Sequence, residues 1–261
     1  MPVGTRKNHW YALALPILGK RCQWKQASVQ NASDFDLTAG MTRVLRRHHT
    51  VGGCVQLLRN GQLAESYTAG YASLSPNTAV TPETVFRTAS IAKLACALLV
   101  MRLQTLGLLQ LEEDISAFWG EPIRNPHHPD QPIPLASLLS HTSGLVDSSA
   151  YYRAFQQNTA ASVLLKSPET YANRKPYKRF QYSNFAAGLI GCLLEFRFQT
   201  SLESLMQQYL FQPLSVDATF DLSTLAGRRI ASSYRVLPAG RLPDFDATAR
   251  FRSASPLDAP D

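Results

Sequence analysis

The segment from Ser90 to Leu106 constrains the fold of this chain most, because it is the longest unbroken stretch of apolar periodicity in the 261 residues. Its apolar residues recur at nearly helical spacing, and no Gly or Pro interrupts them before Gly107. This pattern predicts a helix that begins at Ser90 and ends before Gly107. Ser90 and Lys93 then share one face of the first turn, where the lysine side chain can reach the serine hydroxyl.

A Ser-x-x-Lys quartet at the start of a helix suits nucleophilic catalysis. A serine hydroxyl is a weak nucleophile until a neighbouring base takes its proton, and a lysine amine with a depressed pKa is such a base. The N–H groups at a helix N-terminus also stabilise an oxyanion that forms at an acyl carbon. The quartet alone leaves a second interpretation open, in which Ser90 caps the helix and Lys93 is a surface lysine.

The pattern of elements around this helix predicts an α+β fold. Asn60-Gly61 lies between two strand-like segments, 52–59 and 63–70, which is a strong signal for a β-hairpin. A short amphipathic helix is expected before the hairpin, within residues 34–49. After the Pro-rich loop that follows Asp114, we expect helices over 135–141, 150–166, 186–197 and 202–210, and strands over 218–220 and 230–237. A helical layer would therefore interrupt an antiparallel sheet.

We expect a basic leader and linker over residues 1–34, followed by one domain over 35–261. Within that domain, 35–80 holds the helix and hairpin of the α/β part, 81–215 forms a helical subdomain, and 216–261 returns in part to the α/β part. The apolar run after Arg6-Lys7 resembles the core of an export signal. Export, peripheral attachment to a membrane or cell wall, and a plain N-terminal extension all stay open. An extracytoplasmic or membrane-associated location is favoured, and a cytoplasmic location stays open.

The charge distribution argues against a nucleic-acid-binding body. The first 50 residues hold eight Lys or Arg and two Asp, whereas the remaining 211 hold eighteen basic and seventeen acidic residues. The excess of positive charge therefore belongs to the N-terminal part, and no basic face is expected on the rest. The Cys and His residues form no spacing typical of a metal site, so we predict neither metal nor cofactor.

A second motif, Tyr182-Ser183-Asn184, lies between a polar loop and an apolar helix. In an extended conformation Tyr182 and Asn184 project to the same side, so both side chains can face one site. A phenol can transfer a proton when cationic neighbours lower its pKa, and a carboxamide can bind a substrate or hold the lysine. A core tyrosine followed by capping residues is the other interpretation of this motif alone.

With Ser90-Ile91-Ala92-Lys93, Tyr182-Ser183-Asn184 and the intervening segment Leu138–Leu145, the chain resembles the serine β-lactamase and penicillin-binding-protein superfamily. The resemblance is to the branch of class C β-lactamases, D-alanyl-D-alanine carboxypeptidases and esterases. It covers about residues 35–220, with the motifs in the family's order. It implies a β-lactamase/transpeptidase-like fold, in which helices flank an antiparallel sheet beside an all-helical subdomain.

The resemblance also implies a role for each motif residue. Ser90 would be the acylated nucleophile, with its backbone N–H as one oxyanion donor, and Lys93 the base that activates it. Tyr182 would relay a proton to the leaving group and during deacylation. Asn184 would bind the substrate amide and steady Lys93. The implied partner is a small molecule or peptide with a reactive carbonyl: a lactam, a D-Ala-D-Ala-type peptide or an ester.

The sequence departs from the family at its third motif. No Lys or His followed by Thr or Ser and then Gly occurs after Asn184, although this triplet supplies the second oxyanion donor in the family. We therefore expect an incomplete sheet. Three accounts fit: a truncated product of a longer gene, a divergent protein whose sheet a partner completes, or a non-catalytic relative. The predicted function is a serine hydrolase or acyltransferase, and the alternative is a module that binds cell-wall peptides or β-lactams without turnover.

Overall fold

The computed structural model of the chain describes residues 26–31, 38–48, 50–74, 77–157 and 159–234. The predictions for a leader over 1–34 and for a strand beyond residue 234 lie wholly or largely outside these ranges. The described residues form two compact units. One contains the residues up to Arg87 and those from Leu225 on, and the other lies within Thr88–Thr224.

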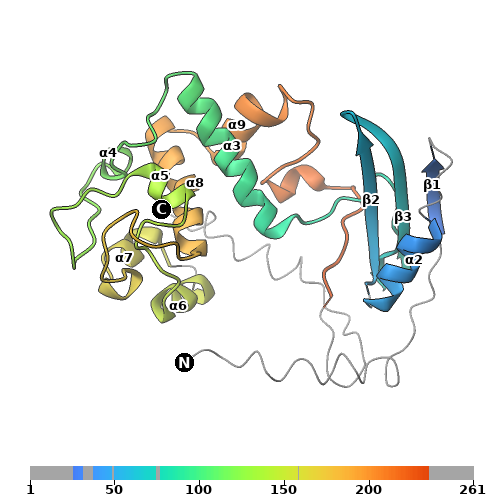
Figure 1. Cartoon of the computed structure of the whole chain (residues 1–261), viewed down its shortest axis with the longest axis horizontal. Helices are drawn as coiled ribbons and strands as arrows, with labels where there is room; N and C mark the ends of the chain where they lie inside the picture. Colours follow the sequence, from blue (N-terminus) through green and yellow to red (C-terminus); the bar gives the residue numbers. More distant parts are fainter. Residues whose placement is uncertain (1–25, 32–37, 49, 75–76, 158, 235–261) are drawn as a thin grey trace. The chain divides into compact units, whose positions relative to one another are not determined.

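The first unit is built on a small antiparallel sheet (Figure 1). Its strands are β1 (Gln26–Asn31), β2 (Gly52–Arg59), β3 (Gln62–Leu74) and β4 (Asn77–Ala79). They follow the order β1-β3-β2, and β4 pairs with the second half of β3. Asn60 and Gly61 join β2 to β3 with positive φ angles of 53° and 75°, as a tight hairpin turn requires. The predicted hairpin is thus confirmed.

Helix α2 (Thr38–Arg47) packs beside this sheet through Thr42, whose hydroxyl is 2.5 Å from that of the buried Tyr67 on β3. The chain returns to the same unit near its described end. Val85 and Ile230 form a parallel bridge, and the Ser232 N–H donates to the Ala72 carbonyl at 2.8 Å. The sheet-containing unit is therefore assembled from two distant stretches of sequence.

A leader and linker was expected over residues 1–34, and for residues 26–31 this prediction is wrong. Residues Gln26–Asn31 form β1, which pairs with β3 from Gln26↔Ala69 to Asn31↔Glu65. The polar composition misled the prediction, because an outer strand is held by backbone hydrogen bonds and does not need an apolar run. The strand predicted over 218–220 is also wrong: this stretch forms no strand, and a 3₁₀ turn follows it at Leu222–Leu225.

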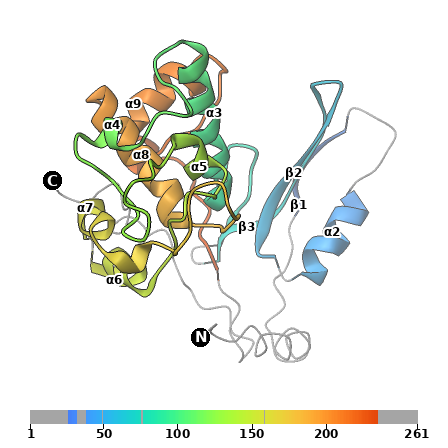
Figure 2. The ribbon, with the colours of Figure 1, turned by 60° about the vertical axis from the view of Figure 1, so that its left-hand side comes forward.

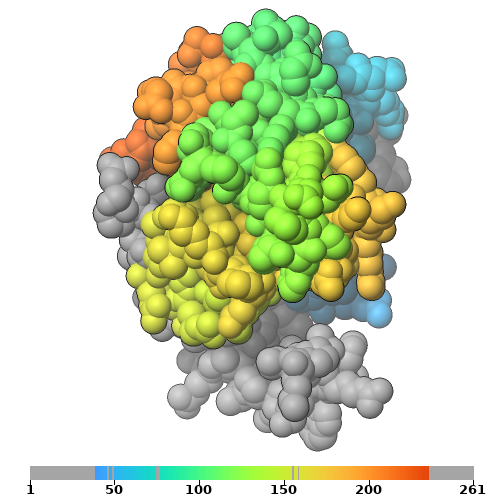
Figure 3. Space-filling model, turned by 90° about the vertical axis from the view of Figure 1, so that its left-hand side faces the viewer, coloured from blue at the N-terminus to red at the C-terminus, as the bar shows by residue number. Residues whose placement is uncertain are grey.

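The second unit is helical (Figures 1 and 2). It contains α3 (Ala92–Thr105), α4 (Ser116–Trp119), α5 (Leu135–Leu139), α6 (Ser149–Gln157), α7 (Ala161–Leu165), α8 (Asn184–Phe198) and α9 (Leu202–Met206). A π-helical turn, Gln207–Phe211, extends α9. The single helix predicted over 150–166 is thus two, α6 and α7. In the space-filling view, the green segment that leads from α3 to α5 and the yellow pair α6 and α7 cover one face of this unit (Figure 3).

The core of the helical unit lies between α3 and α8. Leu99 and Leu103 of α3 and Leu193 and Leu194 of α8 are fully buried, in one cluster with residues of α5 and α9. Because α8 is apolar on nearly all sides, it forms the interior of the unit. The starts of α3 and α8 carry the two sequence motifs, so this core fixes the elements on which they stand.

Gly70 on β3 lies so close to the backbone of Val51 and Gly52 that a side chain does not fit there. Gly70 has a φ of 76°, and a Cβ there would lie 2.2 Å from the Val51 carbonyl oxygen. Gly70→Ala should lower the free energy of unfolding by at least about 2 kcal/mol, since left-handed strain and a backbone clash add. Urea denaturation measures this loss.

Gly61→Ala is the matched control, because Gly61 has a φ of 75° in the same hairpin but open space around its Cβ position. It should lose only the strain of the left-handed conformation, roughly 1 kcal/mol. Equal losses in the two variants would show that the close approach at Gly70 does not contribute.

Candidate active site

Ser90 lies in a short 3₁₀ turn, Ala89–Ile91, that leads directly into α3. The sequence predicted an α-helix from Ser90 on, so the serine stands one turn before the α-helix proper. Ala89 has a φ of 47°, an uncommon conformation for a residue with a Cβ. Backbone strain of this kind persists only where surrounding structure holds it, and it is common beside functional residues. Ser90 itself is exposed.

Lys93 and Tyr182 converge on the Ser90 hydroxyl. The Lys93 Nζ donates to Ser90 Oγ at 3.4 Å, and the Tyr182 hydroxyl is 3.1 Å from the same oxygen. The Lys93 ammonium also lies 5.3 Å from the centre of the Tyr182 ring. We call these three residues the Ser90 cluster. Tyr182 comes from the extended segment before α8, so the cluster joins residues 92 positions apart in the sequence.

The Ser90 cluster changes the acidity of its tyrosine. Hydrogen bonding to Lys93, and then to Ser90, lowers the pKa of Tyr182 from the ordinary value of a phenol. The reason is that a neighbouring cation and hydrogen-bond donors stabilise the phenolate more than the phenol. A phenol of lowered pKa at 3.1 Å from a serine oxygen can exchange a proton with that oxygen.

His141 supports Tyr182 from the segment that follows α5. Its ring centre is 4.6 Å from that of Tyr182, and its Nδ1 accepts the Ser183 N–H at 3.3 Å. Its carbonyl accepts the Gln181 N–H at 2.8 Å, so His141 binds the backbone on both sides of Tyr182. Burial first, and then the charge of Lys93, lower the pKa of His141. A neutral imidazole is what Nδ1 needs in order to accept this hydrogen bond.

Asp147 was not singled out from the sequence. Its carboxylate accepts the Ser183 hydroxyl at 2.8 Å, the Asn184 N–H at 2.9 Å and the Phe185 N–H at 3.0 Å. The first turn of α8 has no acidic residue of its own. A buried helix start needs acceptors for its free N–H groups, so the sequence did indicate that one was required. It could not indicate which distant residue supplies it.

Asn184 is the first residue of α8 and is half-buried. Its side-chain Nδ2 donates to Asp147 at 2.8 Å. Among the described residues, no hydrogen bond joins Asn184 to Lys93. The structure thus brings Ser90, Lys93 and Tyr182 together, while the Asn184 amide is bound to Asp147. Its predicted role toward the substrate and Lys93 stays a prediction.

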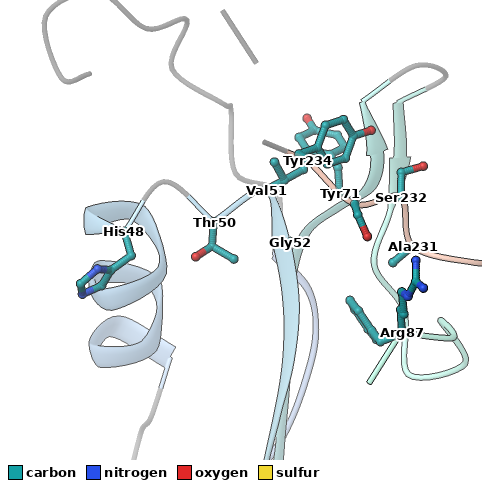
Figure 4. A pocket seen from close by; sticks show the side chains of 11 residues that line it. His48, Thr50, Val51, Gly52, Tyr71, Arg87, Ala231, Ser232 and Tyr234 are labelled. Carbon is teal, nitrogen blue, oxygen red and sulfur yellow. The ribbon is translucent and has the colours of Figure 1, made fainter. Parts of the chain in front are cut away.

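The sheet-containing unit has a separate pocket of about 350 Å³ (Figure 4). Tyr71, Arg87, Ser232 and Tyr234 are among its lining residues. None of the predicted site residues lines it. In the described part of the chain, no group of three or more His, Cys, Asp or Glu side chains is placed to hold a metal ion. The same part contains no helix long and apolar enough to cross a bilayer.

Comparison with known proteins agrees with the motifs. The model of the family named Beta-lactamase matches residues 34–254, most of the chain. The chain belongs to the Beta-lactamase family. It is a serine-hydrolase-like protein with the α+β fold of β-lactamases and transpeptidases, as the sequence predicted.

Two curated relatives illustrate the distance within the family. A protein named Beta-lactamase from Yersinia enterocolitica is 25% identical over 210 residues, which cover 76% of this chain and 49% of the relative. Protein flp from Staphylococcus aureus (strain MW2) is 22% identical over 208 residues, covering 77% of this chain and 42% of that protein. The chain therefore spans less than half the length of these relatives.

A solved structure supports the fold. The octameric penicillin-binding protein homologue from Pyrococcus abyssi superposes with a TM-score of 0.68 at 23% identity, over 82% of this chain and 51% of that one. At this identity the likeness concerns the fold alone.

The acidity of Tyr182 gives a prediction for the Ser90 cluster. The phenol should titrate below its ordinary value of about 10. Lys93→Met should raise the pKa of Tyr182, because the neutral side chain no longer stabilises the phenolate. NMR titration of protein with ¹³C-labelled tyrosine rings measures it, with Tyr182→Phe to assign the signal.

Lys166→Met is the control, since Lys166 is an exposed lysine that pairs only with Glu121, at 4.0 Å, among the described residues. It should leave the Tyr182 titration where it is. An unchanged Tyr182 pKa in Lys93→Met would contradict the electrostatic role of Lys93.

Proposed function

We propose that the chain is a serine hydrolase or acyltransferase that works through an acyl-Ser90 intermediate. The observation that carries the proposal is the Ser90 cluster itself. In a member of the Beta-lactamase family, an exposed serine has a lysine amine 3.4 Å and a phenol 3.1 Å from its oxygen. A nucleophile needs such a base within hydrogen-bond reach.

In the proposed acylation, Ser90 Oγ attacks the carbonyl carbon of the substrate and gives its proton to Lys93, a step that requires the amine form of this lysine. The new C–O bond converts the carbonyl oxygen into an oxyanion. The Ser90 backbone N–H and the partial positive charge at the start of its helix stabilise that oxyanion. When the carbonyl is restored, the bond to the leaving group breaks. Tyr182, resupplied from Lys93, gives the leaving group its proton.

In the second step, water or another acceptor attacks the acyl-Ser90 ester. Tyr182 takes the proton of the attacking group, and Ser90 Oγ leaves with a proton returned through Lys93. The lowered pKa of Tyr182 supports this role, because a base is most effective when its pKa approaches the working pH. Attack by water gives a hydrolase, and attack by an amine or alcohol gives an acyltransferase.

We propose a lactam, a D-Ala-D-Ala-type peptide or an ester as the acyl donor. The names of the relatives support this range, since one is called a β-lactamase and another, from Bacillus subtilis, penicillin-binding protein 4*. In this proposal Asn184 binds the amide of the substrate. Each donor class presents a carbonyl to Ser90 with a leaving group that accepts a proton.

The proposal predicts a covalent adduct at Ser90. A fluorescent penicillin or a fluorophosphonate should label the purified protein, and mass spectrometry should locate the label on the peptide that contains Ser90. Ser90→Ala should abolish the label, because no other group in the cluster replaces the hydroxyl. Ser149→Ala, at an exposed serine of α6, should label like the wild type.

Absence of an adduct on folded wild-type protein would reject the proposal for this chain. The alternative is then tested with the same samples: a wall-derived peptide that binds reversibly, with equal affinity for wild type and Ser90→Ala, would indicate a binding module without turnover.

A further inference from the structure

Both oxygens of the Asp147 carboxylate are used at the start of α8. Oδ1 accepts the Ser183 hydroxyl at 2.8 Å and the Phe185 N–H at 3.0 Å. Oδ2 accepts the Asn184 N–H at 2.9 Å and the Asn184 Nδ2 at 2.8 Å. A single carboxylate thus receives four hydrogen bonds from three consecutive residues. Charge-assisted bonds of this kind are stronger than those between neutral groups.

The backbone before Asp147 is fixed by contacts with a second segment of the helical unit. The preceding residues Leu145 and Val146 are tied to the segment at Thr170 and Tyr171, through a bridge between Leu145 and Tyr171 and a bond from the Val146 N–H to the Thr170 carbonyl at 2.9 Å. Leu145 and Tyr171 are buried in the core of the helical unit. The position of the carboxylate is therefore set by the core, independently of Ser90.

The residue next to the Asp147 contacts is Tyr182, whose ring contacts His141 and whose hydroxyl bonds to Ser90. Its side chain is 45% exposed, so packing alone does not fix the ring. Its two chain neighbours are held by His141, which binds the Gln181 and Ser183 N–H groups, and Ser183 is held in addition by Asp147, which accepts its hydroxyl. A displaced Ser183 would move the phenol away from the Ser90 oxygen.

Asp147 also decides which end of the Asn184 amide is available. Because Nδ2 donates to the carboxylate, the amide cannot turn its NH₂ group elsewhere without leaving a carboxylate lone pair unpaired. The carbonyl oxygen is the other end of the same planar group. Asn184 can therefore offer its carbonyl oxygen as an acceptor to a substrate N–H or to an ammonium group.

We propose that Asp147 is a positioning residue for the reaction at Ser90: it holds residues 182–184 so that the phenol stays beside the serine oxygen and the Asn184 carbonyl oxygen is left for the substrate. The inference rests on the proposed function for its chemistry. Its structural part, the placement of Tyr182 by Asp147, stands apart from turnover and is tested separately.

The first test is the rate of covalent labelling in Asp147→Asn. An asparagine presents an NH₂ group to two of the four donors, so at least two hydrogen bonds are lost while the volume is kept. A shift of the reacting groups by about 1 Å costs on the order of 10²-fold, so the maximal labelling rate should fall by about 10- to 100-fold. With a fluorophosphonate as the probe, the concentration that gives half the maximal rate should change little, because this reactive group offers no amide for Asn184 to bind.

Asp130→Asn is the matched control, since Asp130 is an exposed aspartate in the same unit with no hydrogen bond or ion pair in the described structure. It should label at the wild-type rate.

Asp147→Glu keeps both acceptor oxygens but moves them by one methylene. This variant replaces Asp147→Asn in the test if Asp147→Asn does not fold. It should also lose labelling rate while keeping the circular dichroism of the wild type.

The second test needs no substrate. In protein with ¹³C-labelled tyrosine rings, the deciding variant is Asp147→Glu, because it keeps the negative charge that raises the pKa of Tyr182. The Tyr182 signal should shift in Asp147→Glu as well as in Asp147→Asn, and stay in place in Asp130→Asn. If the wild type is not labelled at all, the proposed function fails, whereas the Tyr182 signal still decides whether Asp147 positions this ring. Wild-type labelling rates together with an unmoved Tyr182 signal in both Asp147 variants would overturn the inference.

Discussion

The site depends on how the buried start of α8 satisfies its free N–H groups. This helix forms the interior of its unit, so water cannot be the partner, and unpaired N–H groups there would cost about 1–3 kcal/mol each. Ser183 caps one of them by accepting the Ala186 N–H at 3.0 Å, and Asp147 accepts two more. Tyr182 directly precedes this capped turn. The hydrogen bonds that satisfy the start of α8 therefore also fix the position of the Tyr182 phenol.

The candidate site lies where the N-terminal ends of α3 and α8 come together. The 3₁₀ turn before α3 presents Ser90, the segment before α8 presents Tyr182, and one hydrogen bond joins them. Helix N-termini carry partial positive charge, and Lys93 adds a full one. The neighbourhood of the serine oxygen is therefore electropositive, and an electropositive setting favours both a phenolate and a developing oxyanion.

Local chemistry explains which parts of the fold could be predicted from the sequence. The hairpin at Asn60-Gly61 and the helices now seen as α3 and α8 follow from turn residues and apolar periodicity, which act over a few positions. The outer strand β1 could not be predicted, because its backbone pairing with β3 leaves no apolar pattern. In the site, Ser90 and Lys93 are three residues apart and predictable, whereas Asp147 reaches α8 from 37 residues away by tertiary contact.

Lys93 affects both the acidity of Tyr182 and the hydrogen bond that holds the backbone beside it. Hydrogen bonding to Lys93 is the largest cause of the lowered pKa of Tyr182, and for His141 the charge of Lys93 lowers the pKa in second place, after burial. The two rings lie 4.6 Å apart. For Tyr182 the result is an easier loss of a proton, and for His141 it is a weaker tendency to bind a second proton. A neutral ring is required for Nδ1 to accept the Ser183 N–H, which in turn holds the backbone beside Tyr182. One ammonium group thus favours both the charge state of the tyrosine and the hydrogen bond that keeps it in place.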